Sequence, residues 1–517
     1  MRIIKLWLVA GVISGCAQHP TQTTVTQPEP THQSPIDITA HPETSDSTLQ
    51  HQDVWQRILA SYRLDIDQDQ QRITSQLNWY KSHQGYLDRV ADRSQRYLYF
   101  IAEQIEARDM PGELALLPIV ESAFDPFAYS HGRAAGVWQF IPSTGRSFGL
   151  HQDWWHDGRR DIRAATEAAL TYLERLQRQF DGDWLLGLAA YNSGGGTVRK
   201  AIRKNRRLGK PTDFWSLELP RETRAYVPKL IALARLLRDA EKYDVRFKPV
   251  ANEPYFAVVN TGGQIDLSQV AQLADTPLDE IYKLNPSFNR WATHPEGPHE
   301  VLVPYKAATV FNQNLAQLPE SARLKWQRYV VRRGDSLSTI AKRFHTTPAA
   351  LQQTNQLRGS IIRAGQALLI PSAMQPAANY AYSAPQRLER LKERRKPSSN
   401  SQRISYQVRS GDSFWSIARQ HDVSVRDITR WNGMAPGDPI KPGQTLTIWS
   451  KNSQPTQAQR EVIRKVRYTV RNGDSLARIA SRFNVRLSDV KRWNRQLARN
   501  KYLQPGQRLT LYVDVTR

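Results

Sequence analysis

The sequence has a single cysteine, Cys16, in 517 residues, which rules out an intramolecular disulfide. Acidic residues are also scarce, because 48 Asp and Glu stand against 72 Lys and Arg and leave a formal net charge of +24. This balance favours a polyanionic partner, which could be a nucleic acid, a membrane surface or an acidic polymer. The 30 prolines and 27 glycines indicate linkers, and the length predicts roughly two to five domains.

Two patterns that would bind a phosphate or a metal are missing. Gly194-Gly195-Gly196 is followed by no Gly-Lys-Ser or Gly-Lys-Thr and preceded by no strand pattern, so it does not form a phosphate-binding loop. The N-terminal histidines lack the short i, i+3 or i+4 pairing of metal sites; they are His19, His32, His41 and His51. We therefore expect no metal and no cofactor.

The N-terminus has the pattern of an exported lipoprotein. Arg2 and Lys5 precede the apolar run LWLVAGVI at 6–13, which is far shorter than the roughly 20 residues of a spanning helix. The sequence ISGC that ends at Cys16 resembles a bacterial lipobox, which implies cleavage before Cys16 and lipidation of this residue. Residues 1–15 are then a signal peptide, and residues 16–52, rich in Thr, Gln and Pro, a disordered tether.

The residue after Cys16 indicates a destination. Ala17, in place of Asp, resembles lipoproteins that are delivered to the outer membrane and face the periplasm. Each acyl methylene group buried in the membrane contributes about 0.8 kcal/mol to anchoring. Because an exported protein does not meet nucleic acid, we expect none as a partner and take the membrane contact to be the lipid on Cys16.

Residues 53–245 have the apolar spacing of helices, for which Asp161 and Asp183 are suitable caps. Within this segment, the apolar run at 114–120 ends in one carboxylate, Glu121. Burial disfavours a charged carboxylate and raises its pKa, as a general acid near neutral pH requires. Pro118 lies inside the same run and removes a helical hydrogen bond, so we expect a kink one turn before Glu121.

Four separated motifs surround this carboxylate in the sequence. They are Glu121-Ser122 with Ser130 nine positions on, Gly136-Val137-Trp138-Gln139, Ala190-Tyr191-Asn192-Ser193-Gly194, and Glu222-Thr223-Arg224-Ala225-Tyr226. Together they resemble the catalytic domain of the family 1 lytic transglycosylases, relatives of goose-type lysozyme. The resemblance implies an all-α, lysozyme-like domain over 53–245. It also implies cleavage of peptidoglycan between N-acetylmuramic acid and N-acetylglucosamine.

The resemblance also implies a role for each candidate site residue. Glu121 would protonate the glycosidic oxygen and then act as base on the muramoyl C6 hydroxyl, closing a 1,6-anhydro ring without water. Ser130 and Tyr191 would orient Glu121 or the substrate, while Gln139 and Asn192 would hydrogen-bond acetamido or backbone groups. Glu222 would be a supporting acid, or only a helix cap, and Tyr226 would line the cleft, or only the core.

The C-terminal part of the chain is repetitive. Three segments share one pattern that begins YVVRRGDSL at 329–337, YQVRSGDSF at 406–414 and YTVRNGDSL at 468–476. Each glycine is followed by an asparagine at one distance, because 355 − 334, 432 − 411 and 494 − 473 all equal 21. The order strand, helix, helix, strand resembles the LysM module, which binds N-acetylglucosamine-containing glycans. We expect these modules at 327–372, 404–450 and 466–514, with linkers at 373–403 and 451–465.

A fourth, degenerate copy is expected at 250–306, where 285 − 267 and 355 − 337 both equal 18 but the Gly-Asp-Ser turn is missing. The fold class is then multidomain: a helical catalytic domain followed by small βααβ modules on flexible linkers. The resemblance implies peptidoglycan glycan as the partner, whose peptide carboxylates would attract the basic modules; cell-wall enzyme partners are unknown.

Two other functions remain open at this point. A goose-type muramidase would use water in place of the C6 hydroxyl, and Asp125 is then the nearest acid in sequence to test. A non-catalytic cell-wall-binding lipoprotein would keep only the modules, which the intact Glu121 and its motifs speak against.

Overall fold

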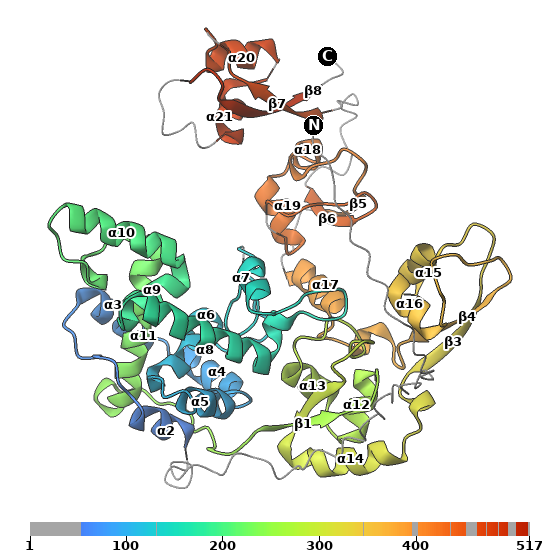
Figure 1. The fold of residues 1–517 in the computed structure, drawn as a ribbon, viewed down its shortest axis with the longest axis horizontal. Coiled ribbons are helices and arrows are strands. Elements are labelled where there is room, and N and C mark those ends of the chain that lie inside the picture. The colour runs from blue at the N-terminus through green and yellow to red at the C-terminus, as the bar shows by residue number, and fades with distance from the viewer. Residues whose placement is uncertain are drawn as a thin grey trace, which may run out of the picture. The chain divides into compact units, whose positions relative to one another are not determined.

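A computed structural model describes residues 53–394 apart from 131 and 345, 402–450 apart from 435, 463–494 apart from 472 and 484, and 503–514. The predicted signal peptide, Cys16 and the tether 16–52 lie outside these residues. Within the described part, a helical domain precedes four small units that each hold one two-stranded antiparallel sheet (Figure 1). None of the described helices combines the length and apolar character needed to cross a membrane.

The first domain is built from helices and short turns. Its α-helices are α2 (Val54–Ala60), α3 (Gln71–Lys81), α4 (Gln84–Ser94), α5 (Leu98–Glu106), α6 (Leu117–Ser122), α7 (Pro142–Ser147), α8 (Ile162–Gln179), α9 (Trp184–Ser193), α10 (Gly195–Arg207) and α11 (Arg221–Arg238). Its 3-10 helices are η1 (Gly112–Leu116), η2 (Gly158–Arg160), η3 (Phe214–Ser216) and η4 (Glu241–Tyr243). Helix α11 packs against α3 and α9 and buries an apolar face that includes Val227, Leu230, Ile231, Ala234 and Leu237.

Two predicted helix starts are confirmed. Asp161 accepts hydrogen bonds from the backbone of α8, and Asp183 accepts one from Leu186 N in α9, at 2.9 Å. Only one of the three consecutive glycines separates the two helices. Gly194 adopts a positive φ of 84°, which glycine tolerates, while Gly195 already begins α10. The end of α9, which carries Tyr191 and Asn192, is therefore fixed by a single residue.

The helix predicted to run through Pro118 is wrong. The chain forms η1 up to Leu116 and starts α6 at Leu117, so that Pro118 lies in the first turn, where its missing N–H costs no hydrogen bond. Glu113 lies in the first turn of η1. It is fully buried, and its carboxylate accepts hydrogen bonds from Arg63 N at 3.0 Å and Leu64 N at 2.8 Å.

The four small units share the order strand, helix, helix, strand. The first unit contains β1 (Phe256–Asn260), α12 (Leu267–Leu273), α13 (Leu278–Leu284) and β2 (Glu300–Pro304), and the second contains β3 (Lys325–Val330), α15 (Leu337–Arg343), α16 (Pro348–Thr354) and β4 (Ala367–Ser372). The third unit contains β5 (Gln402–Gln407), α18 (Phe414–Gln420), α19 (Val425–Trp431) and β6 (Thr445–Ser450). The fourth unit contains β7 (Ile463–Thr469), α20 (Leu476–Arg482), α21 (Leu487–Trp493) and β8 (Arg508–Asp514). The first unit continues into η5 (Tyr305–Ala307), α14 (Ala308–Gln317) and η6 (Glu320–Ala322).

One asparagine closes each of these units. In the second unit, Asn355 donates from its amide to Leu369 O at 2.8 Å and accepts from Leu369 N at 2.7 Å, which ties the end of α16 to β4. Asn432 does the same with Thr447, and Asn494 with Thr510. The sequence spacing of 21 residues marked these asparagines, and their role is to join helix to strand. We call this arrangement the asparagine lock.

The first small unit, which lacks the Gly-Asp-Ser turn, keeps the asparagine lock. Asn285 donates to Leu302 O at 2.7 Å and accepts from Leu302 N at 2.8 Å. In the other three units, the aspartate of the turn accepts a hydrogen bond from the tyrosine that begins the repeat, as from Tyr329 to Asp335 at 2.6 Å. The first unit has instead a buried Asp266, which caps α12 and accepts from Tyr380.

Part of the segment predicted as a linker at 373–403 is helical. It forms η7 (Ala377–Asn379) and α17 (Ala384–Arg394), in which Leu388 and Leu391 repeat at helical spacing and Glu389 pairs with Lys392. The backbone of α17 begins with a hydrogen bond from Ala384 N to Asn289 O at 2.9 Å. This connection is therefore attached to the first small unit over part of its length.

Candidate active site

Glu121 lies in the last turn of α6, half-buried, at the point where the helix gives way to a left-handed Ala123. Its Oε1 accepts a hydrogen bond from the hydroxyl of Tyr226 on α11, at 2.5 Å. Among the described residues, no hydrogen bond reaches the second carboxyl oxygen, Oε2. One oxygen is thus held by the protein while the other is left for a substrate.

The surroundings of Glu121 raise its pKa from the usual 4.5 to about 7. Burial is the main cause, and the negative charge of Glu222 acts in the same direction. The hydrogen bond from Tyr226 and the positive charge of Lys229 oppose the rise. A carboxyl with this pKa is partly protonated near pH 7, so it can give up a proton and take one back.

Two tyrosines, Tyr226 and Tyr191, interact with this carboxyl, the first through a hydrogen bond and the second through charge. Tyr226 is 4% exposed, and burial together with the charge of Glu121 holds its pKa well above the usual range, so the phenol stays a hydrogen-bond donor. Tyr191, on α9, donates its hydroxyl to Trp138 O at 2.9 Å, and the same causes raise its pKa. Tyr191 therefore fixes the backbone beside Gln139 and lies within electrostatic range of Glu121.

The segment that carries Gln139 follows an unusual backbone path. Gly136 has a φ of 79°, and a Cβ at this position would lie 2.2 Å from Arg159 O, so only glycine fits. Trp138 is fully buried and donates from its indole to Thr166. Gln139, half-buried with a φ of 52°, donates to Gly136 O at 2.7 Å. No hydrogen bond from a described residue reaches its side-chain carbonyl oxygen, which leaves this oxygen available to a ligand.

Asn192 and Glu222 lie where α9 meets α11. Asn192 is half-buried, and its Oδ1 accepts from the hydroxyl of Thr223 at 2.8 Å, which leaves its amide N–H groups as donors. Glu222 is exposed in the first turn of α11. Among the described residues it makes no hydrogen bond, and its negative charge contributes to the raised pKa of Glu121.

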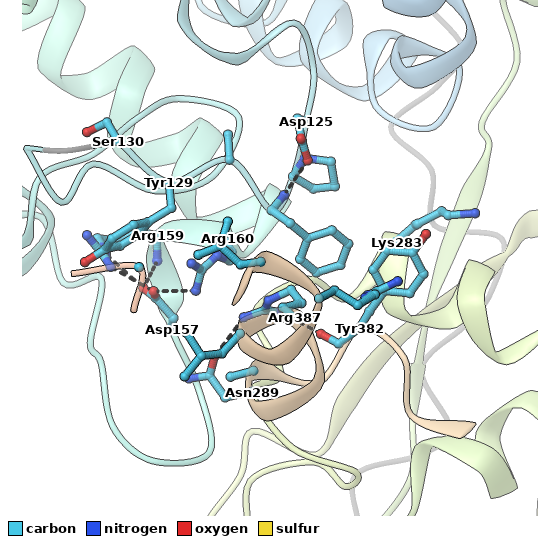
Figure 2. Close-up of a pocket in the computed structure, with 18 of the residues that line it drawn as sticks. Asp125, Tyr129, Ser130, Asp157, Arg159, Arg160, Lys283, Asn289, Tyr382 and Arg387 are labelled. Atoms are coloured by element: carbon cyan, nitrogen blue, oxygen red, sulfur yellow. Dashed lines mark hydrogen bonds and ion pairs between the residues drawn. The ribbon is translucent and has the colours of Figure 1, made fainter. Parts of the chain in front are cut away.

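The side chains of Ser130 and Asp125 have other hydrogen-bond partners than the residues of this cluster. The Ser130 hydroxyl accepts a hydrogen bond from Ala134 N at 3.0 Å, which closes the loop, and among the described residues it shares no hydrogen bond with Glu121. The carboxylate of Asp125 accepts from Phe127 N at 2.9 Å and lies 3.9 Å from Arg93. Both residues line a separate cavity (Figure 2).

The sequence did not predict the contact between Tyr226 and Glu121, because Tyr226 was equally compatible with a place in the cleft and a place in the core. Its hydroxyl reaches Glu121 from 105 positions away, a distance that no local pattern reports. A signal was present, because Glu222 and Tyr226 stand at i and i+4 and share one face of α11. Within the described residues, no group of three or more His, Cys, Asp or Glu side chains is arranged to hold a metal.

Comparison with known proteins assigns each of these parts. Residues 98–214 match the Transglycosylase SLT domain, residues 329–371, 406–449 and 468–511 the LysM domain, and residues 255–320 the LysM-like domain of lytic transglycosylase MltD. The chain is 41% identical over 411 residues to "Membrane-bound lytic murein transglycosylase D" of Escherichia coli, across 78% of this chain and 86% of that protein. It is 29% identical over 169 residues to "Autolysin" of Enterococcus faecalis, across 32% of this chain and 21% of that protein.

Among solved structures, the 70 kDa soluble lytic transglycosylase of Escherichia coli is 23% identical, with a TM-score of 0.22, over 27% of this chain and 24% of that one.

The SLT match falls on the helical domain that holds Glu121, and with the LysM matches it places the chain among the lytic transglycosylases. The predicted fold class, a lysozyme-like helical domain followed by βααβ modules, is thereby confirmed. The identity to the relative from Escherichia coli extends over both parts. The chain belongs to the family of membrane-bound lytic murein transglycosylase D.

Proposed function

We propose that this chain cleaves the β-1,4 bond between N-acetylmuramic acid and N-acetylglucosamine in peptidoglycan without consuming water. The observation that carries the proposal is the state of Glu121: a half-buried carboxyl with a pKa of about 7, of which one oxygen is engaged by Tyr226. A single group of this kind can serve both proton transfers of the reaction.

In the first step, Glu121 acts as general acid. Because Tyr226 donates to Oε1, the carboxyl proton belongs on Oε2, the oxygen without a protein partner. Transfer of this proton to the glycosidic oxygen releases the N-acetylglucosamine side as an alcohol while positive charge develops at C1 of the muramoyl ring. The carboxylate that results keeps its hydrogen bond from Tyr226.

In the second step, the same carboxylate acts as base. It takes the proton of the muramoyl C6 hydroxyl, and the oxygen forms a bond to C1 that closes the 1,6-anhydro ring. Glu121 ends protonated, as it began, so the cycle needs no water, metal or cofactor. A pKa near the working pH suits a group that must give and regain a proton in each turnover.

The remaining site residues would position the sugar. We assign the free amide N–H groups of Asn192 and the carbonyl oxygen of Gln139 to the acetamido groups, because both side chains are half-buried and only partly engaged by protein. Tyr191 is a positioning residue, since its hydroxyl holds the Trp138 carbonyl. The predicted contact of Ser130 with Glu121 is not supported by its place in the loop, and Glu222 acts through its charge.

The LysM modules would hold the enzyme on the polymer. Three modules at 329–371, 406–449 and 468–511 can each bind a glycan weakly, and their connection in one chain raises the local concentration of the catalytic domain. The relative from Escherichia coli is membrane-bound by its name. We infer lipidation of Cys16 and a position on the outer membrane facing the periplasm, on the sequence pattern alone.

Mass spectrometry of muropeptides released from purified sacculi tests the reaction. We expect products that end in 1,6-anhydro-muramoyl units, lighter by one water than hydrolytic products. Reducing ends would assign the chain to the goose-type hydrolases. Glu121→Gln should abolish release, whereas Glu241→Gln, an exposed carboxylate on η4, should not. Undiminished lysis by Glu121→Gln would refute the role of Glu121.

The anchor has its own test. Cys16→Ser should lose incorporation of labelled palmitate and move the protein from the membrane fraction to the soluble fraction. Retention of the label would refute the assignment of Cys16.

A further inference from the structure

A cavity of about 940 Å³ lies beside the loop at 124–130 and is lined by more basic than acidic side chains. Within residues 53–394, eight Arg and Lys residues and three Asp residues line it. It does not include Glu121, but one wall is the loop from Phe124 to Ser130, which begins three residues beyond Glu121. Other walls come from Asp157–Arg160 and from Tyr382 together with α17 (Figure 2).

Two guanidinium groups in this cavity lack a counter-charge of their own. Arg387, half-buried on α17, donates to Tyr382 O at 2.7 Å and to Asn289 Oδ1 at 3.4 Å, and among the described residues none of its hydrogen bonds goes to a carboxylate. The side chain of Arg160 is 9% exposed. It shares Asp157 with Arg159, and its Nε is buried without a partner.

The local electrostatics agree with this geometry. Burial, followed by the repulsion of Arg160, lowers the pKa of Arg387 to about 9. Burial also lowers the pKa of Arg160, and Asp157 only partly compensates. A buried cation without a partner costs free energy, which an incoming anion removes. If these groups served the fold alone, a protein carboxylate would be expected opposite Arg387.

The cavity also offers a flat apolar face. The rings of Phe127 and Tyr382 stack with centroids 4.9 Å apart. Arg387 lies 4.8 Å from the centroid of Phe127, and Arg390 lies 4.7 Å from that of Tyr382. Rings held in this way fix the guanidinium planes. A fixed guanidinium is suited to bind a carboxylate, to which it donates two parallel hydrogen bonds.

We propose that this cavity binds the carboxylates of the peptide stem attached to the muramoyl unit at Glu121, an inference that rests on the proposed function. The nearest wall of the cavity is within reach of such a stem. Phe124 is the third position after Glu121, so their Cα atoms are at most about 11 Å apart, while an extended stem of four amino acids spans about 14 Å. The stem would leave the cleft along the loop from Phe124 to Ser130 and end against Arg387 and Arg160.

Steady-state kinetics on two substrates test the proposal: glycan strands with their stems, and the same strands after an amidase has removed the stems. Arg387→Gln should raise KM about tenfold on strands with stems, the effect of one lost charge-assisted bond, and leave KM on bare strands unchanged. Arg387→Lys keeps the charge and should lie between. Arg203→Gln, the same change at an exposed position of α10, should alter neither. Equal losses on both substrates, or none on either, would overturn the proposal.

Binding measured without turnover separates this proposal from the proposed function. In Glu121→Gln, the disaccharide tetrapeptide should bind about tenfold more tightly than the same compound with amidated carboxylates. Adding Arg387→Gln should remove this preference. Replacing the half-buried Arg387 could disturb the fold, so Arg390→Gln, at an exposed side chain, provides a second variant. Thermal unfolding of both variants shows whether they are folded. Displacement of the tetrapeptide by equimolar inorganic phosphate would show a general anion site and refute the stem peptide. If no 1,6-anhydro products form while the tetrapeptide still binds, the proposed reaction is refuted and the stem site is not.

Discussion

The raised pKa of Glu121 has a consequence for folding stability that can be measured without any substrate. The unfolded chain releases this proton near pH 4.5, while the folded chain holds it until about pH 7. The stability that depends on protonated Glu121 is therefore fully present below about pH 4.5 and is lost as the pH rises through about 7. Glu121→Gln removes the titration and still leaves an amide oxygen to which Tyr226 can donate.

The size of the effect follows from the shift. The difference between 4.5 and about 7, at about 1.36 kcal/mol for each unit of pKa, corresponds to about 3 kcal/mol. This value is an upper limit, because the carboxyl is half-buried and water screens part of it. Relative to the wild type, Glu121→Gln should gain up to about 3 kcal/mol in free energy of unfolding between pH 4.5 and pH 8.5.

Calorimetry of the full-length protein across this pH range checks the prediction on the transition of the helical domain. Glu241→Gln is the matched control, since it removes an exposed carboxylate from the same domain, and its difference from the wild type should stay flat. A difference for Glu121→Gln that does not change with pH would refute the raised pKa. It would also remove the main support for Glu121 as an acid near pH 7.

Four other predictions concern the residues around this site and the modules. Tyr226→Phe removes a hydrogen bond that lowers the pKa of Glu121, so the alkaline limb of the rate profile should move to higher pH while kcat falls on the order of tenfold or more. Glu222→Gln removes a charge that raises this pKa, so the same limb should move to lower pH with KM unchanged; an unshifted limb would contradict the electrostatic role. Glu113→Gln places an amide against backbone N–H groups and should lower the free energy of unfolding by about 2 kcal/mol, measured by urea denaturation. Asn432→Ala opens the asparagine lock of one module and should destabilise that module alone by about 2 kcal/mol, seen as faster hydrogen exchange confined to 404–450.

The sequence allowed the prediction of features that depend on local pattern or on repetition. The apolar run before Glu121 predicted its burial, and the even spacing to Asn355, Asn432 and Asn494 marked the positions of the asparagine lock. Helix caps at Asp161 and Asp183 were equally accessible, because a cap depends on residues within one turn. The path through Pro118 was mistaken, since a proline inside an apolar run fits both a kinked helix and the first turn of a new one.

Features that depend on distant segments were not predictable in this way. The hydrogen bond between Tyr226 and Glu121 requires α11 to pack against α6, which neither segment specifies alone. The basic cavity is assembled from 124–130, 157–160 and 382–394, and its last part was interpreted as a linker because Pro, Gln and Arg are frequent there. Ser130 was assigned by its distance in sequence from Glu121, yet the loop turns its hydroxyl toward Ala134.

The asparagine lock separates two quantities that are easily taken as one. A unit of this kind needs its asparagine to hold helix against strand, and the unit around Asn285 shows that it folds without the Gly-Asp-Ser turn of the other three. Such a unit can therefore lose the surface shared by its relatives and remain a stable part of the chain. The number of folded units along the polypeptide and the number of glycan-binding sites are then independent. Avidity for the cell wall must be established by inactivating units one at a time, because a count of repeats does not determine it.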